Sequence, residues 1–507
     1  MESTNDNKSD IKNIVLTNPV GLLQASSPKI DLEPAVESPT KQVIPLSLPL
    51  PLPLPLSLEQ ELAFNKYINK ENIFITGPGG TGKSELIRKI YDHATLGNKK
   101  IQVCALTGCA ALLLKCRAKT IHSWSGIGIA NGPIDANVQK VAKNHFKRKG
   151  WREARILIID EVSMMSKKLF ELLDLIGKTI RKNNKPFGGI QLIFSGDFYQ
   201  LPPVGNKDEP ETMQFCFESE LWSQIFPQES RIQLVKIFRQ LDPVYTAILN
   251  QIREGRLKRS SVNILQEQVN KSRETDGTTV IRPTKLFPIR NKVEQINNSE
   301  MDKLDSEVKE FNARFILDLP MMTASERSER TLFSQEQIQA ELTYIQNNLI
   351  CDSTIQLKVG AQVMCVVNIE LATGGMLCNG SQGIITRFTE HGVPVVKYSN
   401  SDLEIRMGAH IWPSENIPGI GVSQIPLILA WALTIHKSQG ATMDSAEIDV
   451  GSSVFECGQT YVALSRVKSL EGLYLTSFDV NKIKINKKVQ DYYSSTLSTF
   501  EKSGAKS

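Results

Sequence analysis

Short apolar runs alternate with helix-like segments along this chain of 507 residues. Four such runs, "NIFITG", "IQVCALTG", "RILIID" and "IQLIFSGD", each end in glycine or aspartate, and segments with apolar residues at helical spacing lie among them. Strands that alternate with helices form a parallel sheet with helices on both faces. The pattern therefore predicts an α/β fold.

The same plan occurs a second time. It begins near Ile237 and resumes near Ile425 with "IPLILAWALTIHKSQG". Between them, the runs "LKVGAQVMCVVNIE", "MLCNGSQGIITRF" and "VPVVKY" are separated by Gly and Asn turns, which predicts a small antiparallel barrel. Residues 122–152, rich in Gly and Lys, interrupt the first region and predict a small protrusion without a sheet strand. We assign no chemistry to the charged, helix-prone stretch 306–348.

The first 58 residues differ in composition from the rest. They are polar and end in the repeat "PLSLPLPLPLPLSL" (Pro45–Leu58). Alternating Pro and Leu excludes a helix and favours extended polyproline II structure. Residues 1–58 are therefore predicted to be a disordered tail with a stiff spacer, and a docking segment for a partner is the alternative. Directly afterwards, "SLEQELAFNKYIN" predicts a helix with Ser57 as N-cap and Gln60 at the third helical position.

Charge and cysteine content point to a class of partner and a location. The net charge is +5, and residues 1–58 carry four Lys against six Asp or Glu, so the remainder carries +7. A mildly basic body suits a polyanionic partner. The eight cysteines lack zinc-site spacing and indicate a reducing compartment. No apolar run is long enough to cross a membrane, and no signal or transit peptide is recognisable. We expect an intracellular protein, in the nucleus or at a viral or cytoplasmic replication site rather than in mitochondria.

The segment "GPGGTGKS" (Gly77–Ser84) carries a phosphate-binding pattern. It follows an apolar strand and precedes the helical "ELIRKIYDHA", the context that this motif requires. Its glycines let backbone N–H groups turn inward around an anion, and the helix N-terminus adds positive charge. Lys83 is expected to contact the β- and γ-phosphates, and Ser84 to offer its hydroxyl to Mg²⁺.

Two further strands end in candidate catalytic groups. "ILIIDEVSMM" ends its strand in Asp160, expected in the Mg²⁺ shell, and Glu161, expected to polarise the attacking water. "FSGDFYQLPPVG" follows another strand, and the carboxyl ends of parallel strands share one edge of the sheet. Gln200 is therefore predicted beside these carboxylates, near the γ-phosphate. A plain structural turn is the alternative.

Two arginines far along the chain suggest a second lobe at the nucleotide. Arg239 lies in "LVKIFRQ" and Arg466 in "YVALSRVKS". An arginine inserted from a second lobe stabilises charge on the transferring phosphoryl group. A nucleotide held between two lobes, which close on binding and open on hydrolysis, makes a motor. "AWALTIHKSQGATMD" adds polar groups at a strand-to-helix junction that suit backbone phosphates: Thr434, His436, Lys437, Ser438 and Gln439.

Taken together, these motifs resemble superfamily 1B helicases, and most closely the PIF (petite integration frequency) family. The resemblance runs from Leu58 to about Phe478 and keeps the family's order of motifs: "GPGGTGKS", "ALTGCAA", "IHSW", "IIDEVSMM", "GDFYQLPPV", "FRQ", "LTIHKSQGATMD" and "YVALSRV". The most specific match is "SKKLFELLDLIGKTIRKNNKPFGGIQLIFSGDFYQLPPV", which looks like the family's signature segment. Neither the first 58 residues nor the segment after Asp479 resembles the family.

The resemblance implies an ATP- and Mg²⁺-dependent DNA helicase with 5′→3′ polarity. It implies two RecA-like parallel-sheet lobes, 59–235 and 236–355 with 421–480, a wedge at about 122–152, an SH3-like barrel at 356–420 and a C-terminal tail at 481–507. Gln60 resembles the glutamine that reads adenine, and ATP would lie on Gly77, Pro78, Gly79, Gly80, Thr81, Gly82, Lys83 and Ser84. The catalytic positions are Lys83, Asp160, Glu161, Gln200, Arg239 and Arg466. Ser84 and Asp160 would hold the metal.

Single-stranded and forked DNA are the expected partners, with RNA–DNA hybrids and quadruplexes left open. A monomer or a weak DNA-induced dimer is expected, and repair, recombination, replication or telomere maintenance is the implied task. The resemblance places Thr107, His122, His436, Lys437 and Ser438 near the strand. Basic grooves with stacking aromatic residues bind single strands without sequence preference, which makes Trp124, Phe198 and Tyr199 candidates.

Three alternatives concern the class of protein and one basic segment. "KNHFKRKGWR" (Lys143–Arg152) fits a duplex contact and a solvated face equally well. A RecD-type or phage-type helicase of the same superfamily is an alternative enzyme. An ATP-gated nucleic-acid clamp without turnover is the alternative from another class, and the complete set of catalytic positions argues against it.

Overall fold

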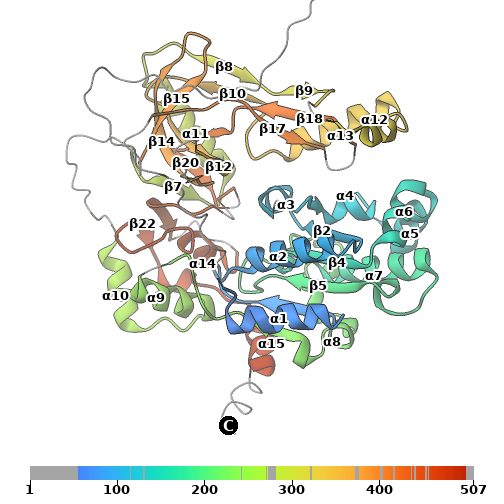
Figure 1. Cartoon of the computed structure of the whole chain (residues 1–507). Coiled ribbons are helices and arrows are strands. Elements are labelled where there is room, and N and C mark those ends of the chain that lie inside the picture. Colours follow the sequence, from blue (N-terminus) through green and yellow to red (C-terminus); the bar gives the residue numbers. More distant parts are fainter. Residues whose placement is uncertain are drawn as a thin grey trace, which may run out of the picture. The chain divides into compact units, whose positions relative to one another are not determined.

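A computed structural model describes residues 55–114, 116–128, 132–240, 242–269, 271, 281–319, 322–371, 376–399, 404–414, 417–435, 437–438, 441–451, 454 and 456–497 (Figure 1). The predicted tail 1–58 therefore lies almost entirely outside the described residues. None of the described helices has both the length and the apolar character needed to cross a bilayer.

Helix α1 (Leu58–Ile68) begins as the sequence predicts. Ser57 is the N-cap: its hydroxyl accepts from the Gln60 N–H, and the Gln60 side chain accepts from the Ser57 N–H at 2.9 Å. This reciprocal pair satisfies two backbone donors that the first helical turn leaves without partners. The predicted N-cap and the position of Gln60 are confirmed.

The first sheet has six parallel strands in the order β3-β2-β4-β5-β1-β6. The four predicted runs supply its central strands β1, β2, β4 and β5, so the predicted parallel sheet is confirmed. The strand bounds are β1 (Ile73–Thr76), β2 (Ile101–Ala105), β3 (Lys119–Thr120), β4 (Ile156–Asp160), β5 (Gln191–Ser195) and β6 (Arg231–Gln233). Helices in this region are α2 (Lys83–Leu96), α3 (Gly108–Leu114), α7 (Lys167–Arg181) and α8 (Glu220–Ile225).

Both faces of this sheet are buried. Ile73 and Ile75 belong to one apolar core together with α2, whereas Phe74 belongs to a second core together with α7. Successive strand residues point to opposite faces, so strand β1 supplies both cores. Because both faces are covered, the strands read as continuous apolar runs.

The interrupting segment is helical. It contains α4 (Ile121–Ser125), α5 (Ile134–Lys143) and α6 (His145–Glu153), and its described residues after Thr120 include no strand before β4. Trp124 and Trp151 pack with their ring centroids 4.6 Å apart, in the core that includes α7. The apolar residues of this segment therefore fix it to the first sheet.

A second parallel sheet has the order β20-β7-β21-β22. Its strands are β7 (Thr284–Phe287), β20 (Ala432–Thr434), β21 (Ala446–Val450) and β22 (Leu473–Phe478). The helices of this region are α9 (Pro243–Glu254), α10 (Arg259–Glu267), α11 (Arg290–Asp302) and α14 (Gln459–Leu464). A long insertion thus separates β7 from β20, which pair directly.

The insertion is mainly antiparallel. Five strands follow the order β16-β15-β14-β11-β19: β11 (Gln362–Cys365), β14 (Gln382–Phe388), β15 (Pro394–Tyr398), β16 (Glu404–Arg406) and β19 (Leu427–Leu429). There are also three smaller sheets. In the first, β8 (Lys309–Asn312) pairs with β10 (Thr354–Leu357); in the second, β18 (Gly421–Gln424) lies between β17 (His410–Pro413) and β9 (Arg314–Ile316); in the third, β12 (Ile369–Glu370) pairs with β13 (Met376–Leu377). The stretch 306–348 forms β8, β9, α12 (Ala324–Arg330) and α13 (Gln335–Asn348).

Residues 481–507 were expected to be a tail, but their described part contains helix α15 (Lys487–Leu497). Val489 and Tyr493 are buried in the core that includes α7. A helix with few apolar residues gives a weak sequence signal. Its burial depends on two tyrosines, Tyr492 and Tyr493, that find aromatic partners more than 200 residues away.

Candidate active site

The loop between β1 and α2 is shaped by its glycines. Gly77 has φ +146°, and a Cβ atom there would lie 2.4 Å from the Leu234 carbonyl oxygen. At Gly80, with φ +86°, a Cβ would lie 2.5 Å from the Cβ of Arg239. Side chains at either position would push away the chain that follows β6. The glycines therefore allow residues 234–239 to run along the loop.

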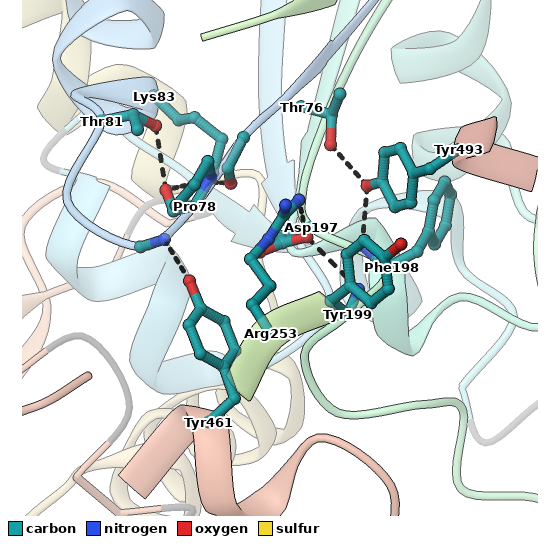
Figure 2. Close-up of polar contacts among 12 residues, drawn as sticks. Thr76, Pro78, Thr81, Lys83, Asp197, Phe198, Tyr199, Arg253, Tyr461 and Tyr493 are labelled. Atoms are coloured by element: carbon teal, nitrogen blue, oxygen red, sulfur yellow. Dashed lines mark hydrogen bonds and ion pairs between the residues drawn. The ribbon is translucent and has the colours of Figure 1, made fainter. Parts of the chain in front are cut away.

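Lys83 lies across the mouth of this loop. Its ammonium donates to the carbonyl oxygens of Gly77 (2.7 Å) and Pro78 (2.9 Å), as Figure 2 shows. Desolvation lowers the pKa of Lys83, while Asp197, Glu161 and Asp160 act in the opposite direction. The loop thus presents a positive charge close to three carboxylates.

Asp160 is the last residue of β4, and Glu161 follows it. Desolvation raises the pKa of Asp160, and desolvation together with Asp160 raises the pKa of Glu161 to about 7. Glu161 also has φ +57°, a left-handed conformation that a residue with a Cβ adopts at a cost. Asp160 is buried and Glu161 half-buried, and poor solvation disfavours the charged form of both carboxyl groups.

Gln200 lies at the carboxyl edge of the same sheet. Strands β4 and β5 are parallel neighbours, so the segment after β5 lies beside the end of β4. The Gln200 N–H donates to the Asp197 carbonyl at 2.8 Å. A Cβ at Gly458, just before α14, would lie 2.6 Å from the Gln200 carbonyl. Gln200 is therefore buried between the first sheet and α14.

Arg239, between β6 and α9, and Arg466, just after α14, both reach the phosphate-binding loop. A Cβ at Gly79 would lie 3.7 Å from Arg239 Nη1 and 3.8 Å from Arg466 Nη2. Arg466 is held by Nε, which donates to the Val462 carbonyl at 2.8 Å, and Nη2, which donates to the Ser465 hydroxyl at 2.8 Å. Desolvation and the nearby Arg239 lower the pKa of Arg466 to about 9. Two guanidinium groups that repel each other are therefore held beside the loop.

The sequence alone assigns no role to Tyr461, a third side chain that contacts this loop. The Gly79 N–H donates to the Tyr461 hydroxyl at 2.9 Å, and Tyr461 lies in α14 (Figure 2). Tyr461 is part of the quoted motif "YVALSRV", so its position was visible although its role was not. A loop N–H thus has a protein partner from the second sheet region.

The other end of the loop is covered by Gln60 and Phe238. The Gln60 amide nitrogen lies 3.3 Å from the Thr81 carbonyl and 3.4 Å from the Gly82 carbonyl, to which it donates. The Phe238 N–H donates to the Gly80 carbonyl at 2.8 Å, and the residue is 40% exposed. An exposed aromatic face beside an amide side chain is suited to a planar base.

Comparisons with known proteins match this arrangement. A family model described as PIF1-like helicase matches residues 55–263, and one described as DNA helicase Pif1, 2B domain, matches 342–388. The chain is 34% identical to the ATP-dependent DNA helicase RRM3 of Saccharomyces cerevisiae, over 86% of this chain and 67% of the relative. It is 34% identical to human ATP-dependent DNA helicase PIF1, over 92% of this chain and 68% of the relative.

The chain belongs to the PIF1-like helicase family. The Pif1 helicase of Candida albicans superposes with a TM-score of 0.66 at 31% identity, covering 87% of this chain and 99% of that one. Bacteroides sp Pif1 in complex with ADP-AlF4 gives 0.69 at 27% identity, covering 88% and 98%. ATP-dependent DNA helicase activity and the two parallel-sheet lobes follow from this membership. We refer to the first and second sheet regions as lobe 1 and lobe 2.

In this PIF1-like helicase, a buried ion pair joins the two lobes. Arg253 of α9 donates through Nε to Asp197 Oδ2 (2.9 Å) and through Nη2 to Asp197 Oδ1 (2.7 Å). Both side chains are almost completely buried; burial acts to lower the pKa of Arg253, but the charge and hydrogen bonds of Asp197 outweigh it and raise that pKa. Such a paired arrangement gives geometric specificity. Sequence reasoning missed it because neither residue has a distinctive spacing.

Three of the residues predicted to touch DNA are buried. Phe198 is 1% exposed within an aromatic core, and Trp124, at 6%, packs on Trp151. Ser438 is fully buried, and its hydroxyl donates to the Ile435 carbonyl at 2.8 Å. The rings of Phe198 and Trp124 pack against other apolar side chains, and the Ser438 hydroxyl hydrogen-bonds within a backbone turn. In this structure the three side chains therefore hold local structure and offer no exposed surface to a strand.

The remaining candidates differ in accessibility. Thr107 and His122 are half-buried in lobe 1, and burial lowers the pKa of His122. Lys437 is more exposed, and its ammonium lies 3.4 Å from Asp352. The ring of Tyr199 stacks on Tyr493. His436 lies outside the described residues.

Proposed function

We propose that this helicase moves 5′→3′ along single-stranded DNA and opens duplex DNA ahead of it, driven by ATP bound between its two lobes. The position of Arg239 and Arg466 beside Gly79 carries this proposal. Both arginines come from chain segments after lobe 1, so a nucleotide on the loop would touch both lobes. Hydrolysis followed by release of the cleaved phosphate would remove the charge that these guanidinium groups bind and let the lobes separate.

Each site residue then has a role. Lys83 and the loop N–H groups hold the β- and γ-phosphates, and Gln60 with Phe238 faces the base. Glu161 activates the attacking water, and Gln200 orients it. The Gly79 N–H, which donates to the Tyr461 hydroxyl, points into the loop where the phosphates would bind. With ATP bound, the Tyr461 hydroxyl would therefore give up this hydrogen bond and form one with a phosphate oxygen.

The donors also fit Mg²⁺. Ser84 offers a hydroxyl in the first turn of α2, and Asp160 offers a buried carboxylate whose pKa is raised by desolvation. Mg²⁺ binds oxygen ligands and usually keeps substrate phosphates and waters in its shell. Bound with ATP, it would neutralise charge on the phosphates.

We propose that Thr107, His122 and Lys437 contact the DNA strand, with His436 as a further candidate. The basic segment of α6, "HFKRKGWRE", would contact duplex phosphates, since Lys149 and Arg152 are exposed on it. Solved relatives include Bacteroides Pif1 bound to single-stranded DNA and two coordinating Pif1 helicases at forked DNA. RNA–DNA hybrids and quadruplexes are further candidate substrates.

A cellular or viral replication site is the proposed place of action. A viral relative, uncharacterized protein 030L of Invertebrate iridescent virus 6, is 32% identical over 86% of this chain and 93% of its own length. The yeast and human relatives are cellular proteins. We therefore propose the nucleus or a viral replication site.

Gln200→Ala tests the proposed link between DNA binding and hydrolysis. Without its amide the attacking water loses its orientation, so DNA-stimulated kcat should fall by about 10- to 100-fold, while the KM for ATP stays within about twofold. Phosphate release with and without oligo-dT measures both values. Gln266→Ala, on the exposed side of α10, is the matched control. Unchanged DNA stimulation in Gln200→Ala would mean that the segment is only a structural turn.

A further inference from the structure

The C-terminal helix α15 reaches the nucleotide loop through a single side chain. The Tyr493 hydroxyl forms a 2.6 Å hydrogen bond with the Thr76 hydroxyl and accepts the Phe198 N–H at 3.1 Å (Figure 2). Thr76 ends strand β1, immediately before Gly77, and Phe198 begins the short segment that leads to Gln200. One buried oxygen therefore joins the strand that bears the phosphate loop to the segment that bears the water-orienting glutamine.

The ring of Tyr493 makes a second set of contacts. It stacks on Tyr199 with centroids 4.8 Å apart and planes 12° from parallel. The Arg253 guanidinium lies 4.5 Å from the Tyr199 centroid and 5.4 Å from that of Tyr493. Because Arg253 is paired with Asp197, the ring also shields the ion pair that joins the lobes. Low polarity around the pair strengthens it.

The adjacent Tyr492 does something different. Its hydroxyl accepts the Trp222 indole N–H at 3.0 Å, and its ring stacks on Phe217 with centroids 4.5 Å apart. These contacts are with the α8 region of lobe 1. Tyr492 therefore anchors α15, whereas Tyr493 contacts the groups around the nucleotide loop.

Residues just before α15 and within it also contact lobe 2. The Gln490 side chain donates to the Glu254 carbonyl at the end of α9 at 3.1 Å, and a Cβ at Gly255 would lie 2.6 Å from Ile485. Helix α9 carries Arg253. Helix α15 thus contacts both the segment that bears Gln200 and helix α9, whose Arg253 pairs with Asp197.

We propose that Tyr493 is a positioning residue for ATP hydrolysis: through Thr76, Phe198 and Tyr199 it fixes the Gln200 segment relative to the phosphate loop and to Arg253. This inference rests on the proposed ATPase function. It makes α15 a part of the motor, since movement of α9 when the lobes open or close would be transmitted to Gln200 through the Arg253–Tyr199–Tyr493 contacts.

Tyr493→Phe in the full chain tests the proposal, because it keeps the ring and removes only the hydroxyl. The variant loses both hydrogen bonds of that hydroxyl, so we expect DNA-stimulated kcat to fall by at least about fivefold, the factor corresponding to one hydrogen bond, with the KM for ATP and oligo-dT affinity unchanged. Thr76→Val removes only the bond to Thr76 and should have a smaller effect. The double variant should be no worse than Tyr493→Phe alone, because Tyr493→Phe already removes the bond that Thr76→Val removes.

Tyr492→Phe is the matched control, because it loses a buried hydrogen bond of the same helix away from the loop. A purely structural role for α15 would lower the unfolding temperature in both variants and leave the kcat of both near that of the unsubstituted chain, or lower both equally; either outcome overturns the proposal. If the unsubstituted chain itself shows no DNA-stimulated hydrolysis, the proposed function fails instead, so the two failures are distinguishable.

Discussion

Lys83→Ala should abolish DNA-stimulated ATP hydrolysis while single-stranded DNA binding persists. The ammonium lies across the loop mouth, held by the Gly77 and Pro78 carbonyls, and faces the carboxylates Asp160, Glu161 and Asp197. Without it, the charge that develops on the transferring phosphoryl group loses its nearest cation on the loop. Loss of one such preorganised group costs about 10²–10³-fold in rate, and phosphate release with oligo-dT measures it.

Two measurements separate this effect from misfolding. Lys89→Ala, an exposed position on the same helix α2, should hydrolyse ATP like the unsubstituted chain. Fluorescence anisotropy should give Lys83→Ala an affinity for labelled oligo-dT close to that of the control. Turnover by Lys83→Ala within about twofold of the control would contradict the assignment of this loop as the catalytic phosphate site.

Arg466→Ala should have a comparably large effect from the opposite lobe. Its guanidinium is buried, held by Val462 and Ser465, and lies beside Gly79. An arginine in this position accelerates phosphoryl transfer by about 10³–10⁵-fold where it acts on the transition state. We therefore expect kcat to fall by at least about 10³-fold, with a smaller change in nucleotide binding, measured by single-turnover hydrolysis and a fluorescent ATP analogue.

The conservative variant and a surface control sharpen this prediction. Arg466→Lys keeps a charge but not the fork of donors, so it should recover only part of the lost rate. Arg259→Ala, at the exposed start of α10, should leave kcat unchanged. If Arg466→Ala weakens nucleotide binding but leaves kcat at saturating ATP unchanged, Arg466 acts only in ground-state binding and the proposed role is wrong.

The sequence was sufficient wherever local pattern determines structure. Ser57 and Gln60 form the expected capping box because both partners lie within one turn. The apolar runs became parallel strands because strands covered on both faces must be apolar throughout. The carboxyl edge then follows from topology, which places Asp160 at the end of β4 and the segment that bears Gln200 after the end of its neighbour β5.

It was insufficient wherever a contact joins distant segments. Thr76 and Tyr493 are 417 positions apart, and Asp197 and Arg253 are 56 apart, so no spacing rule connects them. Aromatic residues were the other difficulty. Phe198 and Trp124 lie in motifs that suggest DNA, yet their burial is decided by Trp222 and Trp151, which pack against them from elsewhere in the chain. An aromatic side chain in a motif therefore does not reveal whether it faces solvent.

Strand displacement on forked DNA tests the central claim most directly. Forks with a single-stranded 5′ tail, a 3′ tail or both would be incubated with the full chain, with and without ATP and Mg²⁺. We predict release of the displaced strand only with ATP and Mg²⁺, and only when a 5′ tail is available for loading. Release that needs a 3′ tail would contradict the polarity, and ATP hydrolysis without any strand release would contradict the proposal that this chain unwinds DNA.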